Sequence, residues 1–281
     1  MSKIKLIVDS THDLPQQFLT DNGIVQVPLN IVMDGKTYLD QEEITSEEYL
    51  QKLVTLDEIP KTSQPPTGKF AEIYEKYIEE GYEILSLHMT HRLSGTVGSA
   101  QAAANMVDGK VTVIDSGFIA QSYGFIIQNV AELIIKHKSM KEIVSAIETM
   151  KKQSKLFLVI SQLDYLTKGG RISRGKGFIG GLMNLKPVAQ VEEGEIRVIQ
   201  NARTQNSIVK LLTKEVAQMA EEYKYLRIGI SQADAEELLE KIKKAVEPYT
   251  DEKISLNTTT PIVSTHTGPG AIGLSLFGYN D

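Results

Sequence analysis

The chain has 281 residues, of which 41% are hydrophobic and 23% charged, so it can build one large hydrophobic core or two smaller ones and is not a disordered chain. Its 30 Lys and Arg residues against 36 Asp and Glu give a net charge of -6, with both signs scattered, which argues against a nucleic-acid-binding surface. Cysteine is absent, which excludes disulfides, thiolate metal sites and thiol nucleophiles.

The N-terminal sequence MSKIKLIVDS has an apolar run before Asp9 that is too short for the core of a signal peptide. No later segment approaches the roughly 18 uninterrupted apolar residues of a membrane-spanning helix. We therefore expect a cytoplasmic protein. The histidines lack metal-binding spacing and no carboxylate cluster resembles a calcium loop, so we expect no metal site.

Short apolar runs alternate with amphipathic stretches along the chain, a pattern typical of an α/β protein with largely parallel sheets. The apolar runs predict strands at 4–9, 83–89, 111–115, 156–160, 226–231 and 253–257. Helical periodicity predicts helices at about 67–79, 95–106, 119–136, 140–151, 204–222 and 234–246.

Two dipeptides, Asp34-Gly35 and Glu193-Gly194, sit between alternating runs and predict one β-hairpin in each half of the chain. The helical stretch that ends near 153 separates two α/β halves of comparable length. We therefore expect an N-terminal α/β domain at 1–153 and a C-terminal α/β domain at 154–281.

Small polar residues follow two of the expected strands. Asp9-Ser10-Thr11 comes directly after the first strand, and Asp115-Ser116 after the third. The carboxyl end of a strand is where an open α/β sheet usually places its ligand. The alternative is a helix cap, with Thr11 or Asp13 in the capping position.

Two further motifs place hydroxyl groups before helices. Thr62 lies in TSQPP, where the prolines fix the backbone, and Ser94 lies in SGT at the start of the helix near 95–106. A helix that begins with glycine and hydroxyl residues is a good site for an oxyanion, because its first N–H groups are unpaired and its dipole favours negative charge. In each case a helix-entry loop with a capping residue is the alternative interpretation.

The segment KGGRISRGKGFIGG at 168–181 contains a GxGxxG match, but no strand directly precedes it, so we do not interpret it as a dinucleotide-binding loop. Its Arg171 and Arg174 suggest a basic loop for a phosphate or an acidic partner, or simply a solvated loop. His266, in THTGPGAIG, has polar and glycine-rich surroundings that leave it free to hydrogen-bond a carboxylate or phosphate.

In this order, the motifs IVDSTHDLP, KTSQP, LSGT, VIDS, YLTKGGRIS, LKPVAQVEEGEI, ART and THTGPGAIG resemble the DegV family over nearly the whole chain. The resemblance implies two α/β domains with one long-chain fatty acid buried at their junction. Within this family, the fatty-acid-kinase binding subunits called FakB present the acid to a separate ATP-dependent kinase that makes acyl phosphate for phospholipid synthesis. An acyltransferase and transient membrane contact are further partners that the resemblance implies, and nucleic acid is not.

Matched motif by motif, the fatty-acid carboxylate site of the family falls on Thr62, Ser94 and His266. Arg171 and Arg203 match basic positions toward the exposed end of the ligand, and we expect these two, with Arg174, to contact phosphate or the partner kinase. The bound fatty acid is the ligand, and no other cofactor is implied. Because the carboxylate must accept a phosphoryl group, we expect it to lie near the surface in a site of neutral donors and not to be locked to a buried arginine.

Three functions compete on the sequence. The first is a fatty-acid carrier with no turnover of its own. The second is a phosphotransferase or hydrolase that acts on a small acid through Asp9, Asp115 and His266, although no nucleotide loop or nucleophile–base pair accompanies them. The third, a DNA-binding regulator, lacks a helix-turn-helix signature and a basic stripe.

Overall fold

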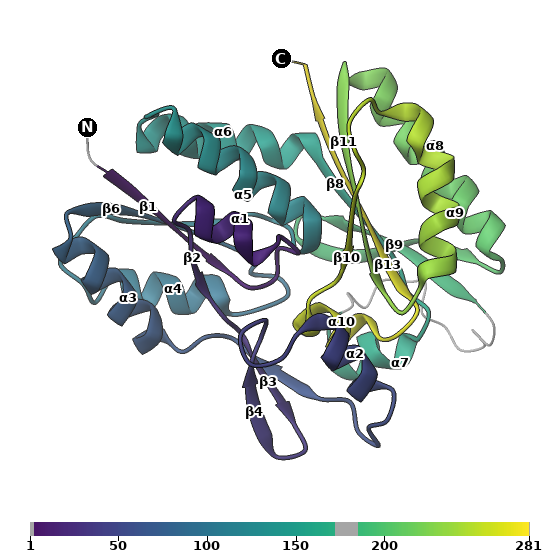
Figure 1. Ribbon diagram of the computed structural model, residues 1–281, viewed down its shortest axis with the longest axis horizontal. Coiled ribbons are helices and arrows are strands. Elements are labelled where there is room, and N and C mark those ends of the chain that lie inside the picture. Colours follow the sequence, from purple (N-terminus) through teal and green to yellow (C-terminus); the bar gives the residue numbers. More distant parts are fainter. Residues whose placement is uncertain (1–2, 172–184, 281) are drawn as a thin grey trace.

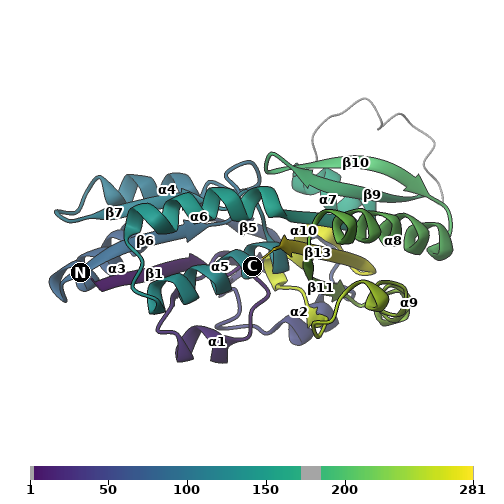
Figure 2. The same cartoon turned by 90° about the horizontal axis from the view of Figure 1, so that it is seen from above.

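The computed structural model of the protein describes residues 3–171 and 185–280. Two β-sheets lie side by side, and helices α5 (Ala120–Ile135) and α6 (Met140–Gln153) pack at their junction (Figure 1). Seen from above, both helices run along the long axis of the molecule, from the first sheet toward the second (Figure 2). Helix α5 contacts strands of both sheets and so joins them.

The first sheet has four parallel strands in the order β2-β1-β6-β7. Its strands and neighbouring helices are β1 (Lys3–Asp9), α1 (Gln16–Asp21), β2 (Val25–Val27), α3 (Thr67–Glu79), β6 (Tyr82–His88), α4 (Thr96–Ala104) and β7 (Val111–Asp115). Along β1, Ile7 packs with Phe70 of α3 and Ala100 of α4, whereas Leu6 and Val8 belong to the core that contains α5. Both faces of the sheet are therefore buried, which explains the continuous apolar run in β1.

The second sheet has six strands in the order β10-β9-β8-β13-β11-β12. Its elements are β8 (Ser154–Val159), β9 (Lys186–Glu192), β10 (Glu195–Ala202), α8 (Gln205–Glu222), β11 (Tyr225–Ala233), α9 (Glu236–Val246), the 3₁₀ turn η1 (Glu247–Tyr249), β12 (Ser255–Thr258) and β13 (Ala271–Tyr279). Helices α8 and α9 cover one face, and α5 and α6 the other.

The α/β class and the parallel first sheet are confirmed, but the second sheet differs from the expected largely parallel arrangement. Only β11 and β12 run parallel in it. Strand β13 comes from the end of the chain, inserts between β8 and β11, and runs antiparallel to both. Period-2 and period-3.6 patterns do not show where such a last strand will insert.

A small antiparallel sheet, β4-β3-β5, lies beneath the two larger ones (Figure 1). Its strands are β3 (Asn30–Met33), β4 (Lys36–Leu39) and β5 (Lys61–Ser63). The short helices around it are α2 (Ser46–Leu53), α7 (Leu163–Gly169) and α10 (Pro261–Thr267). Both expected hairpins are confirmed. Their central residues have positive φ, 50° and 73° at Asp34 and Gly35 and 49° and 80° at Glu193 and Gly194, as type I′ turns require.

Helices α7 and α10 occupy segments in which the sequence pattern predicts no helix. Both are seven residues long, too short to show a clear helical period. Helix α10 begins with Pro261, after Thr260 caps it by accepting from the N–H of Val263. It contacts α2, α7, β3 and β5, so it sits between the small sheet and the second half of the chain.

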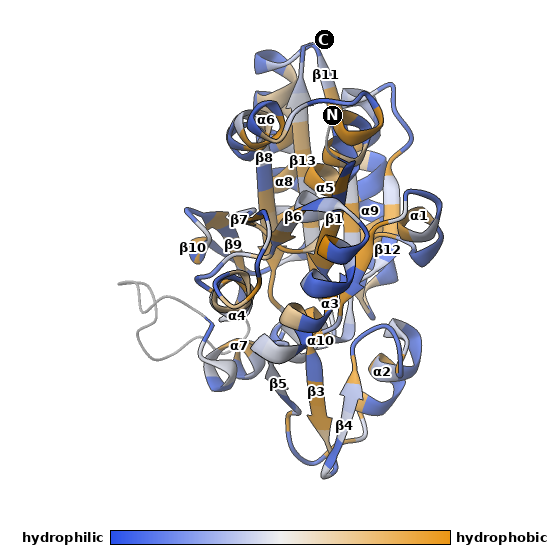
Figure 3. Ribbon diagram, turned by 90° about the vertical axis from the view of Figure 1, so that its left-hand side faces the viewer, coloured by the Kyte–Doolittle hydropathy of each residue, from blue (hydrophilic) through white to orange (hydrophobic). Residues whose placement is uncertain are grey.

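The largest hydrophobic core is continuous across both halves of the molecule, from Leu6 in β1 to Phe277 in β13. Hydrophobic residues gather on the interior strands and on α5, and the outer loops are mostly hydrophilic (Figure 3). The expected division at 153/154 falls where α6 ends and β8 begins. It stays a prediction, because the two halves share this core. No helix within the described residues is both long and apolar enough to cross a membrane.

Candidate functional site

A cavity of about 270 Å³ lies where the small sheet, α7 and α10 meet the loops that follow β1 and β6. Its apolar wall is formed by Leu29, Met89, Leu93, Ile119, Leu166, Ile196, Ile262 and Val263. These residues come from both sides of position 153, so the cavity lies at the junction of the two halves. A mostly apolar pocket with a few convergent polar groups is the form that small-molecule sites usually take.

The polar part of the cavity wall is built around Thr62 and His266. Thr62 lies in the middle of β5, and His266 lies in the last turn of α10. The Thr62 hydroxyl and His266 Nε2 are 2.8 Å apart, a hydrogen bond between residues 204 positions apart in the chain. The structure thus brings together two of the three residues expected at the carboxylate site.

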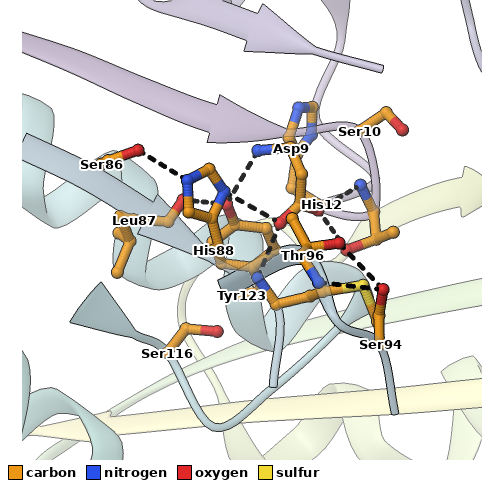
Figure 4. Close-up of polar contacts among 12 residues, drawn as sticks. Asp9, Ser10, His12, Ser86, Leu87, His88, Ser94, Thr96, Ser116 and Tyr123 are labelled. Carbon is orange, nitrogen blue, oxygen red and sulfur yellow. Dashed lines mark hydrogen bonds and ion pairs between the residues drawn. The ribbon is translucent and has the colours of Figure 1, made fainter. Parts of the chain in front are cut away.

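Ser94, the third expected residue, lines the same cavity from the loop before α4. Its Oγ lies 2.8 Å from the hydroxyl of Thr96 and accepts from the Thr96 N–H at 3.3 Å, as Figure 4 shows. The residue in the capping position is Gly95, which has no side chain to cap the helix. The first turn of α4 and the Ser94 hydroxyl therefore lie together at the cavity, in an arrangement suited to an anion.

The electrostatics of the site keep His266 neutral at pH 7. Burial, together with the positive charge of nearby Arg171, lowers the pKa of His266 to about 4. Arg171 lies on the cavity wall, half-buried, and donates to the carbonyls of Leu93 and Gly169. Burial also lowers the pKa of the Arg171 guanidinium, which nevertheless stays charged.

Of the three arginines that the sequence predicts to contact phosphate or a partner, the two within the described residues do not lie together. Arg171 is part of the cavity wall, whereas Arg203 is exposed after the end of β10 and is not among the lining residues. Arg174 and the GxGxxG match lie outside the described residues. Arg171 lies near His266 and is half-buried, not fully buried, and it donates to two backbone carbonyls. Its contact with phosphate or a partner stays a prediction.

The alternative catalytic set of Asp9, Asp115 and His266 does not converge, since only His266 lines the cavity. Asp9 is fully buried and accepts from Thr11, from the N–H of Met89 and from His88.

The network around Asp9 continues inward, away from the cavity. The other nitrogen of His88 lies 2.6 Å from the hydroxyl of Ser86 (Figure 4). The Ser86 hydroxyl in turn lies 2.6 Å from the hydroxyl of Tyr74. All of these side chains are closed to solvent. Through Asp9, the network holds Thr11 and Met89, which line the cavity.

Within residues 3–171 and 185–280, no group of three or more His, Asp or Glu side chains is arranged to hold a metal ion. Asp115 pairs with His91, and its other oxygen accepts from the N–H of Gly117 at 2.7 Å. This bond between residues two positions apart is an Asx turn in the loop before α5, whose capping position is Ile119 and has no side-chain cap.

Two glycines of the site pack closely against side chains that the sequence did not point to. A Cβ at Gly169 would lie 2.5 Å from His266 Nδ1, and a Cβ at Gly95 would lie 2.1 Å from the side-chain oxygen of Gln64. Gly169 therefore packs too closely on the His266 ring for a side chain, whereas a side chain at position 95 would require the flexible end of Gln64 to move. The paired glycines at 169–170 and the SGT motif were the available signals, but glycine is common in loops, so neither pointed to His266 or Gln64.

Comparison with known proteins agrees with this geometry. The family model described as "Uncharacterised protein, DegV family" matches residues 3–278. A curated DegV domain-containing protein of Staphylococcus aureus is 43% identical over 275 residues, which cover 98% of each chain. A curated DegV domain-containing protein of Listeria innocua is 36% identical over 282 residues, 99% of each chain.

Solved structures give the same result. A fatty-acid-binding DegV family protein from Thermus thermophilus superposes with a TM-score of 0.92 at 32% identity, covering 98% of this chain and 99% of that one. A fatty-acid-binding DegV family protein from Streptococcus agalactiae superposes with a TM-score of 0.91 at 26% identity, covering both chains fully (100% of each). The fold is thus the α/β fold of these fatty-acid-binding DegV structures. This chain belongs to the DegV family.

Proposed function

We propose that this protein binds one long-chain fatty acid in the cavity and presents its carboxylate to a separate ATP-dependent kinase, as a FakB-type subunit. The observation that carries the proposal is an apolar cavity whose polar groups, Thr62, Ser94 and His266, come from three separate segments. Similar structures described as fatty-acid-binding support the ligand class.

The carboxylate is recognised by hydroxyl donors that neutral His266 orients. In the tautomer that protonates Nε2, the ring donates to the Thr62 oxygen across 2.8 Å and leaves the Thr62 hydroxyl hydrogen free for the ligand. Ser94 offers a second hydroxyl beside the first turn of α4. Hydrogen bonds to a charged group contribute about 1.5–3 kcal/mol each, so two such donors fix the position of the head group.

The tail supplies most of the affinity. Burying about a dozen methylenes at ~0.8 kcal/mol each gives on the order of 10 kcal/mol before the costs of association, enough for tight binding without a covalent bond. Arg171 adds a positive charge near the head group. Because it is half-buried and already donates to two carbonyls, it attracts the carboxylate without a dedicated bidentate pair.

Ligand content tests the proposal directly. Native mass spectrometry of the purified protein should show an added mass of one fatty acid, which solvent extraction then identifies. We expect the delipidated protein to take up one equivalent of hexadecanoate. A protein that carries no lipid and takes up none would overturn the proposal.

We expect acyl phosphate to form only when a partner kinase is present, because the described cavity offers no phosphate-binding loop and no converging nucleophile and base. The measurement is acyl-phosphate formation from ATP and bound hexadecanoate, with and without the kinase. Acyl phosphate made by this chain alone, free of contaminating kinase, would show that the chain is an enzyme.

The separation of Arg171 from Arg203 predicts different effects for the two alanine variants. Arg203→Ala should leave hexadecanoate affinity unchanged and lower the kinase-dependent rate, with wild type more sensitive to salt than the variant, because exposed charges are screened. Arg171→Ala should weaken hexadecanoate binding itself, because Arg171 is on the cavity wall. A competition assay with a fluorescent fatty-acid analogue and a salt series of kinase rates measure the two effects. If both variants lost hexadecanoate affinity and kinase-dependent rate to the same extent, the two arginines would not have the separate roles proposed here.

A further inference from the structure

Helix α10 carries His266 and other cavity residues, but two carboxyl groups from the first half of the chain hold its beginning. The carboxyl of Asp13 accepts from the N–H of Thr260 at 3.1 Å and from the hydroxyl of Thr259 at 3.2 Å. Asp13 follows β1, and Thr260 is the residue that caps α10. This contact therefore joins residues 247 positions apart in the chain, across the junction at which the cavity lies.

Asp40 holds the same helix two residues further along. One of its oxygens accepts from the N–H of Ile262 at 3.4 Å, and the other accepts from the hydroxyl of Ser10 at 2.6 Å. A third restraint comes from α2, where the hydroxyl of Tyr49 lies 2.5 Å from that of Thr265. Asp40 and Tyr49 are fully buried. Each restraint reaches α10 from the half of the chain that also carries Thr62 and Ser94.

Burying these carboxyl groups carries an unfavourable free energy. Asp13 and Asp40 are both buried, and neither forms an ion pair with a Lys or Arg in the part of the chain that the structure describes. Asp13 also has a φ of 51°, a conformation that non-glycine residues seldom adopt. Burial raises the pKa of Asp13 to about 6 and that of Asp40 to about 8. Buried groups with a strained backbone or without an ion-pair partner persist only where surrounding contacts hold them in place, and such groups cluster at functional sites.

We propose that Asp13 and Asp40 are positioning residues that fix α10 across the junction, and so hold His266 against Thr62 in the head-group site. The argument is geometric. His266 is five residues beyond Pro261 on a seven-residue helix, so a shift of the first turn moves the ring with it. The inference rests on the proposed fatty-acid function for its ligand readout. For its structural readout it needs only the free protein.

The test compares an acid with its alcohol. A helix that no longer presents His266 should impair recognition of the carboxylate but not of the tail, whereas general destabilisation should weaken both ligands alike. We expect Asp13→Ala and Asp40→Ala to lower hexadecanoate affinity by about tenfold, the effect of losing one charge-assisted hydrogen bond. Affinity for hexadecanol should stay within about twofold, because tail burial is unchanged.

Conservative and control variants sharpen the comparison. Asp13→Asn and Asp40→Asn retain an oxygen that accepts from the α10 backbone, so they should keep most of the preference for acid over alcohol. Glu142→Gln changes another carboxylate that caps a helix, since Glu142 accepts from the N–H of Ser139 at α6. Helix α6 contributes no residue to the cavity, so this variant should match wild type.

The second readout is the NMR signal of the His266 ring in ligand-free protein. We expect the alanine variants to shift this signal and its titration, while the asparagine variants and Glu142→Gln leave both close to wild type. The inference would be overturned if folded alanine variants kept both the wild-type ratio of hexadecanoate to hexadecanol affinity and the wild-type His266 signal. Wild type that binds neither ligand would instead refute the proposed function, and the NMR comparison would still decide the inference.

A milder change covers the case in which the alanine variants do not fold. Thr259→Val removes the hydroxyl that donates to Asp13 and leaves the Thr260 N–H in place. It should move the His266 signal in the same direction as Asp13→Ala, by a smaller amount. An unmoved signal in this folded variant would count against the positioning role.

Discussion

Combining Thr62→Val with Ser94→Ala should lower hexadecanoate affinity by at least about 100-fold. The double variant removes both hydroxyl donors of the head-group site, and each hydrogen bond to a charged group contributes about 1.5–3 kcal/mol. Val keeps the shape of Thr62, so the apolar cavity is preserved. His266 Nε2 also loses its partner 2.8 Å away.

A matched ligand provides the control for this variant. Hexadecanol has the same tail but no charge, so its affinity should change far less than that of hexadecanoate. We would measure both ligands by competition with a fluorescent fatty-acid analogue, and check folding by thermal melting. If the double variant binds hexadecanoate as wild type does, the head-group site lies elsewhere in the cavity.

Asp40→Asn should make the protein more stable relative to wild type as the pH rises from about 5 to 8. Burial raises the pKa of Asp40 to about 8 from its ordinary value of 3.8, so between these values the folded state holds a proton that the unfolded state has lost. The free energy of unfolding of wild type therefore falls as the pH rises through this window. Asn does not titrate. At roughly 1.36 kcal/mol per pH unit, the difference has an upper limit on the order of 5 kcal/mol.

Urea denaturation of both proteins at several pH values measures this difference. Other buried groups, such as His12 and His266 with pKa values of about 4, affect wild type and variant alike and cancel. Glu142→Gln is the control of opposite sign, since capping bonds lower the pKa of Glu142 to about 2. The stabilisation that Glu142 gives to wild type should be lost only as the pH falls below about 4.5. Above pH 5, the free energies of unfolding of wild type and Glu142→Gln should change with pH in parallel. A stability difference for Asp40→Asn that does not change with pH would show that Asp40 is ionised in the folded protein.

Local sequence patterns were sufficient for much of the fold. The apolar run of β1 and the amphipathic stretch of α8 follow from periods of 2 and 3.6 residues, which reflect which faces are buried. The two hairpins follow from Asp-Gly and Glu-Gly pairs, because their turns need positive φ. Such signals involve neighbours in sequence, so a single chain displays them.

Other features of the fold depended on distant parts of the chain. The antiparallel second sheet results from the insertion of β13 between β8 and β11. Strand β8 lies more than a hundred residues before β13 in the chain, and β11 about forty residues before it. Helices α7 and α10 are too short for a period to appear, and they are stabilised by packing.

The site shows the same division. The sequence by itself determined the residue types: hydroxyls at Thr62 and Ser94 beside prolines and glycines, and a histidine at 266 in a glycine-rich turn. Only the tertiary structure decided that Thr62 meets His266, that Arg171 joins the cavity wall while Arg203 does not, and that Asp13 and Asp40 hold α10. The physical reason is that these contacts link residues up to 247 positions apart, and they form only when the shared core brings the two halves together.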